Sequence, residues 1–481
     1  MAISLSNNRV ANYAVVASAL LVTAVLLVSM LVSFVWLPLI VLTLPLLVYG
    51  YWQTYKMPYL WVIIIVTGTF LGNLVHVVEG AAVPITLFQI ALAAAVVSIV
   101  IRRLADGNLT MRLLGLEIHF MLLLALIYVS LLWSPDPMDG FIEGTRFLIS
   151  VFFIYLVFNE MKRQNEMIHL MVAATVVAVL LGAYAVYENL TNVDVAIQNI
   201  LAEGSMMRGR VSGTTNDPNR FATMFLIPMA FTACVILADT NKVYKVLSIA
   251  AFAIMSGGLI VTYSRSAWVA AIFMIIIIAW YYRNVKLFAY IGLLIVVVLI
   301  AVPQFSYTLI NAAQRFLDIT AGTADDSSRI RVLLGIAAFG MFIDSYFIGV
   351  GYRGFVDRFT DYYSLQETVD VAEPHNVIYT ILAELGLIGI ILYLLIMIKI
   401  LMIAHSNIKR SEDLTEKILS ITCFSTILAF LIFYQFYGGG MNDNNLWLMC
   451  ALAFSLYYAG PAMEKPDDKN EPQTIPKTGI P

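Results

Sequence analysis

Apolar runs of about 20 residues, separated by short polar connections, recur along nearly the whole chain. A helix of about 20 apolar residues is long enough to cross the hydrocarbon core of a bilayer. The pattern therefore predicts fourteen membrane-spanning helices, at approximately 12–32, 34–52, 58–78, 83–103, 113–133, 140–160, 167–188, 218–239, 243–263, 266–283, 286–303, 375–401, 415–437 and 443–460.

Two long connections, at about 189–217 and 304–374, interrupt this regular alternation. Loops of such length in a compact membrane protein are usually functional or disordered. The second one contains an apolar stretch at 332–350. We expect this stretch to form a helix that lies in the interface or packs over the bundle, with a further span as the alternative.

The composition agrees with a membrane protein, because 61% of the 481 residues are apolar and only 12% are charged. Soluble domains carry about 25% charged residues. The expected fold class is an all-α polytopic integral membrane protein with about 12 to 14 transmembrane helices and one large loop. The first apolar run is too long for a signal peptide and is followed at once by another, so we interpret it as an uncleaved anchor.

Charged residues orient the predicted helices. With the N-terminus in the cytoplasm, positive charges gather at the inner mouths, as membrane proteins prefer. These residues are Lys56, Arg102, Arg103, Arg112, Lys162, Arg163, Lys242, Lys245, Arg283, Lys286, Lys409, Arg410 and Lys417. In this arrangement all 11 lysines lie on the inner side, whereas 10 of the 17 arginines lie on or near the outer side.

This difference between lysine and arginine points to chemistry. A guanidinium group grips phosphate oxygens through two parallel hydrogen bonds, whereas an ammonium group is a hydrated point charge. An outer face with arginine and without lysine predicts that the protein handles a phosphate-bearing substrate outside the cytoplasm.

The predicted organisation has six parts. They are N-terminal transmembrane helices at 1–188, an outer loop at 189–217, central helices at 218–303, a large outer loop with short helices at 304–374, C-terminal helices at 375–462 and a disordered cytoplasmic tail at 463–481.

Four outer segments are candidates for function. The first loop ends in the sequence MRGRVSGTTNDPNR at 207–220, which ends with a helix-start signal and suits an anion or a sugar. A well-capped loop with solvated arginines explains it equally well.

Arg265, in the sequence TYSRS at 262–266, lies at a membrane boundary, where an arginine is costly unless it is paired. We favour a functional role; the alternatives are that it snorkels to the interface or is bridged to a carboxylate.

The large loop supplies the other two segments. Arg329 and Arg331 follow Asp325 and Asp326 at a predicted helix start, where a cation opposes the helix dipole. Either the aspartates or a bound anion compensate for this.

His375 lies where the large loop re-enters the membrane and is the best-placed base, although a lone histidine is more often structural. Glu384 lies about 13 Å further along the same helix and should have a cationic partner, with Arg265 and Arg146 as candidates. Near the last outer turn, the sequence GGGMNDNN at 438–445 suits sugar hydroxyls or a simple turn.

The sequence lacks the motifs that are typical of several other classes of protein. The chain has no phosphate-binding P-loop, no dinucleotide fingerprint and no basic stripe of the kind that nucleic acid requires. Cys234, Cys423 and Cys450 all fall within apolar spans, so no outer metal set includes them. We therefore expect neither a cofactor nor a metal, and no nucleic-acid partner.

These segments, in this order, resemble the superfamily of O-antigen ligases and O-antigen polymerases, which are bacterial membrane glycosyltransferases. The matching pieces are residues 208–219, with the patterns R-x-x-G and N-x-P-N; Ser264, Arg265 and Ser266; and Asp326 to Arg331, leading into FIGVGY at 347–352. The most specific piece is Pro374, His375 and Asn376, followed by Tyr379, Leu382, Glu384, Leu385, Gly386 and Gly389. The resemblance covers roughly residues 205–400.

The resemblance implies an integral-membrane glycosyltransferase fold with a large periplasmic loop, in the bacterial inner membrane with both termini cytoplasmic. It also implies glycan transfer from a polyprenyl-pyrophosphate donor without nucleotide sugar or metal. By resemblance, Arg210, Arg265 and Arg331 bind pyrophosphate, although Arg208 and Arg329 align as well. His375 then activates the acceptor hydroxyl, and Asn216, Asn219, Asn376 and Glu384 bind glycan or support the site.

Our leading hypothesis is a periplasm-facing ligase that transfers an O-antigen-like glycan to an acceptor hydroxyl, such as that of lipid A-core. A polymerase of repeat units, with another lipid-linked glycan as acceptor, and a protein O-oligosaccharyltransferase are the alternatives. A lipid-glycan flippase is a different class. It is disfavoured because the sequence shows no internal repeat and its notable charges gather at one face.

Overall fold

The computed structural model describes residues 50, 52–71, 87–108, 110–191, 210–215, 217–283, 326–362 and 374–459, with the side chains of 71 and 326–331 excepted. All regular elements in these residues are helices. They are α3 (Tyr59–Leu71), α4 (Leu87–Ala105), α5 (Glu117–Ser130), α6 (Pro137–Glu160), α7 (Gln164–Thr191), α9 (Pro218–Thr223), α10 (Leu226–Leu237), α11 (Lys242–Val261), α12 (Arg265–Tyr281), α15 (Asp326–Asp344), α16 (Phe355–Tyr362), α17 (Val377–Arg410), α18 (Leu414–Phe433), the 3₁₀ helix η2 (Gly440–Asn442) and α19 (Asn444–Ala459).

Seven helical stretches in the described residues are long and apolar enough to cross a membrane: α4, α6, α7, α9 with α10, α11, α17 and α18. Each coincides with a predicted span to within a few residues at its start, and α3, α5 and α12 are shorter apolar helices at further predicted spans. The predicted class, an all-α polytopic membrane protein, is confirmed. The predicted spans at 12–32 and 286–303, almost all of the one at 34–52 and the tail at 463–481 lie outside the described residues.

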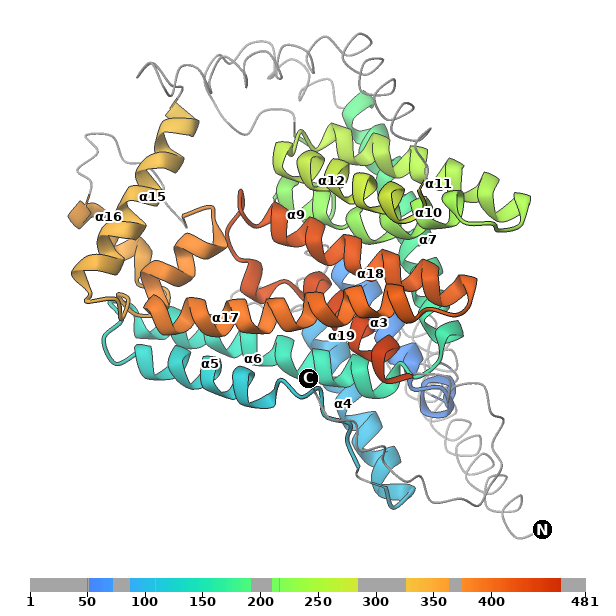
Figure 1. Cartoon of the computed structure of the whole chain (residues 1–481), viewed down its shortest axis with the longest axis horizontal. Helices are drawn as coiled ribbons and strands as arrows, with labels where there is room; N and C mark the ends of the chain where they lie inside the picture. The colour runs from blue at the N-terminus through green and yellow to red at the C-terminus, as the bar shows by residue number, and fades with distance from the viewer. Residues whose placement is uncertain are drawn as a thin grey trace, which may run out of the picture.

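The helices run along one another, so that their ends form two groups (Figure 1). At one end, which we call the His375 end, α6, α9, α12, α17 and α19 begin; Val377 at the start of α17 donates its N–H to Tyr434 just after α18. At the other, the Lys162 end, α5, α7, α11 and α18 begin; Arg112 before α5 donates its N–H to Asn159 near the end of α6.

Lysine and arginine are distributed unequally between these ends, because arginines lie at both ends and the helix starts at the His375 end carry arginine. Lys162, Lys242 and Lys417 lie where helices begin at the Lys162 end, whereas Arg220 and Arg265 lie in the first turns of α9 and α12 at the His375 end. That the Lys162 end faces the cytoplasm stays a prediction.

Helix starts at the His375 end are set by local capping. Asp136 and Asp217 each precede a proline at the first helical position, and their side chains accept backbone N–H groups of α6 and α9. Asn376 caps α17 by accepting the N–H groups of Ile378 and Tyr379. Such residues satisfy the unpaired donors of a first turn. The helix start predicted at the N-x-P-N pattern is confirmed.

Helix α17 is broken at Gly386, whose backbone angles are φ 64° and ψ −156°. The freed carbonyl groups of Ala383 and Glu384 accept N–H groups from Val350 at 2.8 Å and Gly351 at 3.0 Å. Backbone groups within a membrane protein must find partners inside the protein. The segment 347–351 supplies them, which explains why FIGVGY and the sequence around Gly386 occur together.

Close approach of the two backbones requires glycine. A side chain at Gly386 would place its first carbon 2.2 Å from the carbonyl oxygen of Phe347, and one at Gly349 would place it 2.5 Å from that of Glu384. Both glycines also have positive φ. No other residue fits at these positions without displacing the neighbouring backbone.

The apolar stretch expected at 332–350 is helical as far as Asp344, where α15 ends. Helix α15 packs against α16 and α17 beside the start of α17 (Figure 1). It therefore leads from the predicted arginine pair at 329–331 to the segment that fills the break in α17.

We expect Gly386→Ala to destabilise the protein, because the backbone conformation is open almost only to glycine and the added carbon meets a carbonyl oxygen. Backbone strain alone should cost about 1–3 kcal/mol. Thermal unfolding of purified protein in detergent measures the effect. Gly68→Ala is the control, since its neighbours are at 3.7 Å or more and alanine favours the helix. An unchanged midpoint for Gly386→Ala would contradict this account of the break.

Candidate functional site

A cavity with a volume of about 770 Å³ lies at the His375 end. It lies between α6, the start of α9, the start of α17 and the turn from α18 to α19. Its polar lining comprises Gln89, Glu143, Arg146, Ser150, Asp217, Arg220, Arg353, His375, Thr380, Glu384, Tyr434, Tyr437, Asn442, Asp443 and Asn444. The cavity thus brings together charged and hydrogen-bonding groups from segments almost 360 residues apart in the sequence.

His375 is the exposed imidazole of this cavity. Its backbone has φ 53°, in the left-handed region that few non-glycine residues adopt. The next residue, Asn376, holds this conformation by capping α17 and by donating from Nδ2 to the carbonyl of Gln435 at 3.0 Å. Strained backbone of this kind is concentrated at functional sites. The histidine is therefore held in place by its neighbours as part of the cavity lining.

Two tyrosine–aspartate pairs surround Arg220. The hydroxyl of Tyr437 donates to Asp217, and that of Tyr434 donates to Asp443. Arg220 is close enough to all four to interact with them electrostatically. Burial and then the charge of Asp443 raise the pKa of Tyr434 well above its usual value. Its hydroxyl therefore stays protonated, and Asp443 keeps its hydrogen-bond donor.

The amide-rich turn at 438–445 is attached to α6. Asn442 donates from Nδ2 to Glu143 at 2.7 Å, and Ser150 donates to Asn444 at 3.0 Å. Glu143 also forms an ion pair with Arg146, one turn away on α6. The turn thus forms part of the cavity wall, and its hydrogen bonds hold it against α6.

Arg210 belongs to a second group of side chains, next to the cavity wall. Its Nε donates to the carbonyl of Thr262 at 3.0 Å and its Nη2 to Oδ1 of Asn219 at 2.8 Å. The hydroxyl of Ser264 donates to the same Asn219 oxygen at 2.8 Å. These bonds join the end of the first loop to the turn before α12, where Arg265 is the first helical residue.

The predicted site residues thus fall into two groups on the His375 end. His375 and Glu384 line the cavity. Asn376 directly follows His375 and donates a hydrogen bond to the carbonyl of Gln435, in the turn after α18. Arg210 and Arg265 are not among the cavity-lining residues. Arg210 is joined to the cavity wall through Asn219, the neighbour of Arg220, and Arg265 directly follows Ser264, which also donates to Asn219.

Other predicted residues are only partly described. Arg208 and Asn216 lie outside the described residues, as do the side chains of Arg329 and Arg331. The backbone of Arg331 lies one helical turn before Gly335, which faces the ring of Tyr379 in the first turn of α17. The start of α15 is therefore near the start of α17.

Sequence reasoning did not select Arg220 and Arg353, both of which line the cavity. Arg353 forms an ion pair with Asp139 at 2.7 Å. A signal was present in the sequence, because Arg220 directly follows the N-x-P-N motif and Arg353 directly follows FIGVGY, and both belong to the outer arginines.

Arg146, a predicted candidate for the cationic partner of Glu384, instead forms an ion pair with Glu143. Among the described residues, no cluster of three or more possible metal ligands is found.

Part of the chain is similar to known proteins. Residues 250–394 match the O-antigen ligase family model. This match includes Arg265, His375, Glu384 and both sides of the break at Gly386. The resemblance inferred from the motifs is confirmed.

The chain is also similar to the teichuronic acid biosynthesis protein TuaE of Bacillus subtilis (strain 168). The two are 22% identical over 382 residues, which is 77% of this chain and 78% of the relative. Together the two matches support a membrane enzyme of ligase or polymerase type in polysaccharide biosynthesis.

We expect Asn219→Ala to destabilise the site, because one amide oxygen accepts hydrogen bonds from both Arg210 and Ser264. Loss of an acceptor that leaves partly buried donors unpaired costs about 1–3 kcal/mol. Thermal unfolding in detergent checks this. Asn165→Ala, at an exposed position on the Lys162 end, is the matched control. Equal midpoints for both variants would mean that the network contributes nothing to stability.

Proposed function

We propose that the protein transfers a glycan from a polyprenyl-pyrophosphate donor to an acceptor hydroxyl at the His375 end. The observation that carries the proposal is the cavity in which exposed His375 lies beside Arg146, Arg220 and Arg353. An imidazole supplies a base, and guanidinium groups supply the charge that a departing pyrophosphate needs. The family match over residues 250–394 supports a glycan as the transferred group.

The transfer is one displacement. His375 accepts the proton of the acceptor hydroxyl while the hydroxyl oxygen attacks the anomeric carbon of the donor glycan. The bond from that carbon to the pyrophosphate oxygen breaks, and polyprenyl pyrophosphate leaves. Arg220 lines the cavity and holds the pyrophosphate there. Arg210, next to the cavity wall at Asn219, and Arg265 are the further arginines that we propose for the pyrophosphate. Arg331, at the start of α15, is a further candidate for this role.

The remaining lining groups suit the sugar. Asn442 and Asn444 offer amides in a turn attached to α6, and Thr380 and Tyr437 offer hydroxyls. Neutral donors and acceptors of this type match sugar hydroxyls without competing for the phosphate. Glu384 and Asn376 support the site from the start of α17.

We further propose that the Lys162 end faces the cytoplasm, so that the cavity opens on the outer side of the bacterial inner membrane. This orientation follows the preference of lysine and arginine for cytoplasmic loops. A glycan carried on a membrane lipid is then the activated donor within reach of the cavity.

Ligase and polymerase share this donor and differ in the acceptor. The family description names a ligase, whereas TuaE is named for teichuronic acid biosynthesis. The second name favours keeping the polymerase as an alternative, and lipid A-core is then one acceptor among several. In a deletion strain, long polymer left on the carrier indicates a ligase, and single repeat units indicate a polymerase.

Purified protein in liposomes, with a synthetic polyprenyl-pyrophosphate glycan and either a lipid A-core or a second lipid-linked glycan as acceptor, tests the function. We expect a glycosylated acceptor and free polyprenyl pyrophosphate. Movement of the donor across the bilayer without transfer would indicate a flippase instead, and absence of transfer to both acceptors would contradict the proposal.

We expect His375→Ala to lower the rate of transfer by about 10²- to 10⁴-fold, the usual contribution of a positioned base. Donor binding should remain, since the arginines are unchanged. Transfer rate and binding of labelled donor are measured on the same preparation. His405→Ala is the control, because His405 contacts Tyr281 at the Lys162 end. Near-normal transfer by the His375 variant would assign this histidine a structural role only.

We expect Arg265→Lys to impair transfer by about tenfold or more, because the charge persists but paired hydrogen bonds to pyrophosphate are lost. Arg283→Lys, just beyond the other end of α12, is the matched control and should keep its activity. The initial rate at saturating acceptor measures both. If the two lysine variants are equally active, Arg265 acts only as a structural charge.

A further inference from the structure

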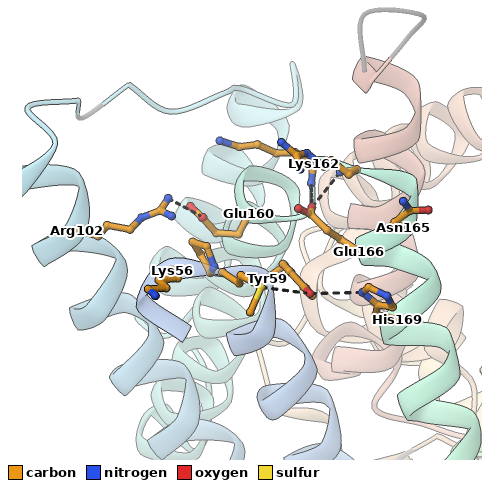
Figure 2. A pocket seen from close by; sticks show the side chains of 11 residues that line it. Lys56, Tyr59, Arg102, Glu160, Lys162, Asn165, Glu166 and His169 are labelled. Carbon is orange, nitrogen blue, oxygen red and sulfur yellow. Dashed lines mark hydrogen bonds and ion pairs between the residues drawn. The ribbon is translucent and has the colours of Figure 1, made fainter. Parts of the chain in front are cut away.

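A second cavity, with a volume of about 390 Å³, lies at the Lys162 end (Figure 2). The ends of α4 and α6 and the starts of α3 and α7 surround it. Lys56, Arg102, Lys162 and Arg163 supply four positive charges to its lining. The glycan-transfer site does not use any of these residues.

The two carboxylates of this cavity are already engaged. Glu160, whose side chain is only 2% exposed, forms ion pairs with Arg103 at 2.6 Å and Arg102 at 3.4 Å. Glu166 accepts the backbone N–H groups of Lys162 and Arg163 at 2.8 and 3.0 Å (Figure 2).

The lysine and arginine side chains facing the cavity are less engaged. Within the described residues, Lys162 and Arg163 form no side-chain ion pair, and Lys56 lies 4.6 Å from the ring centre of Trp52. The cavity therefore presents an excess of positive charge. The preference of cations for the cytoplasmic side explains why these residues lie at this end of the protein. It does not explain why four of them line one cavity that contains only two carboxylates.

The surroundings of Lys162 disfavour its charged form. Burial lowers the pKa of Lys162, and Arg112, Arg103 and Arg102 lower it further, against the opposing effect of Glu160. A bound anion would relieve this repulsion. Neutral hydrogen-bonding groups are also present, since Tyr59, Asn165 and His169 line the same cavity and the hydroxyl of Tyr59 lies 3.5 Å from His169.

The exposed apolar surface of α4 favours a membrane lipid as the source of the anion. Val97, Ile101 and Leu104 are exposed apolar residues of α4, the helix that carries Arg102. Acyl chains pack on such a surface, whereas a soluble phosphate gains nothing from it. Basic pockets between transmembrane helices on the cytoplasmic side bind anionic headgroups in this way.

We propose that this cavity binds the phosphate headgroup of an anionic membrane lipid, with the acyl chains along α4. The headgroup lies between Lys56, Lys162 and Arg163, and it joins α3 and α4 to the start of α7. The site is separate from glycan transfer, so lipid binding is expected whether or not the proposed reaction is correct.

Native mass spectrometry of the full-length protein, taken from nanodiscs of equal phosphatidylglycerol and phosphatidylcholine, tests the proposal. We expect retained phosphatidylglycerol in excess over phosphatidylcholine. In the double variant Lys162→Gln, Arg163→Gln, the affinity for phosphatidylglycerol should fall about tenfold or more, since two cations at a charged membrane surface are lost. Lys56→Gln alone should cause a smaller loss.

The matched control is Lys242→Gln, Lys245→Gln, which removes two lysines at the start of α11 on the same end. It should retain the lipid as the unchanged protein does. Equal loss in both double variants, or equal retention of both lipids, would overturn the proposal. Displacement of phosphatidylglycerol by millimolar inorganic phosphate would assign the cavity to a free anion instead. Thermal unfolding confirms that each variant is folded.

Discussion

The need to satisfy every backbone polar group inside the protein governs how the site is built. Helix α17 is interrupted at Gly386, and the carbonyl groups left without helical partners accept hydrogen bonds from backbone N–H groups of the segment 347–351. In a bilayer an open backbone is tolerated only where protein or a cavity covers it. The break therefore fixes the position of the segment 347–351 next to Glu384, which lines the cavity.

The same constraint explains the glycines of two distant motifs. Gly349 and Gly386 face each other's backbone, and a side chain at either would meet a carbonyl group. Gly351 lies equally close to Ser134, in the turn between α5 and α6. Three segments that are far apart in the sequence are thus held within backbone contact, and Arg353 follows directly with its ion pair to Asp139. The arginine reaches the cavity because the glycines let the backbones meet.

Charge divides the molecule into two chemically different ends. The His375 end carries arginines with acidic and amide neighbours, an arrangement suited to a phosphate and a sugar together. The Lys162 end combines lysines with arginines around Glu160, which forms ion pairs with Arg102 and Arg103, and Glu166. A lysine ammonium group binds a phosphate as a point charge, whereas an arginine guanidinium group also fixes its orientation through paired hydrogen bonds. A bound lipid headgroup needs only the charge, whereas the departing pyrophosphate must also be oriented.

Periodic apolar runs and local capping signals are properties of short segments. The sequence alone therefore predicted the described membrane helices and the start of α9 at Pro218. It also predicted the unequal distribution of lysine and arginine between the two ends. The motifs also selected His375, which the structure places at the cavity. They did not separate Arg210, held by Asn219 beside the wall, from Arg220, which faces the cavity.

That distinction depends on the direction of side chains across helices from different parts of the chain, which no local pattern encodes. The break in α17 was hidden for the same reason. A glycine in an apolar run is compatible with a continuous helix, and only the partner segment at 347–351 shows that its backbone is open. The convergence of cations around the second cavity likewise needed α3, α4, α6 and α7 to be packed together.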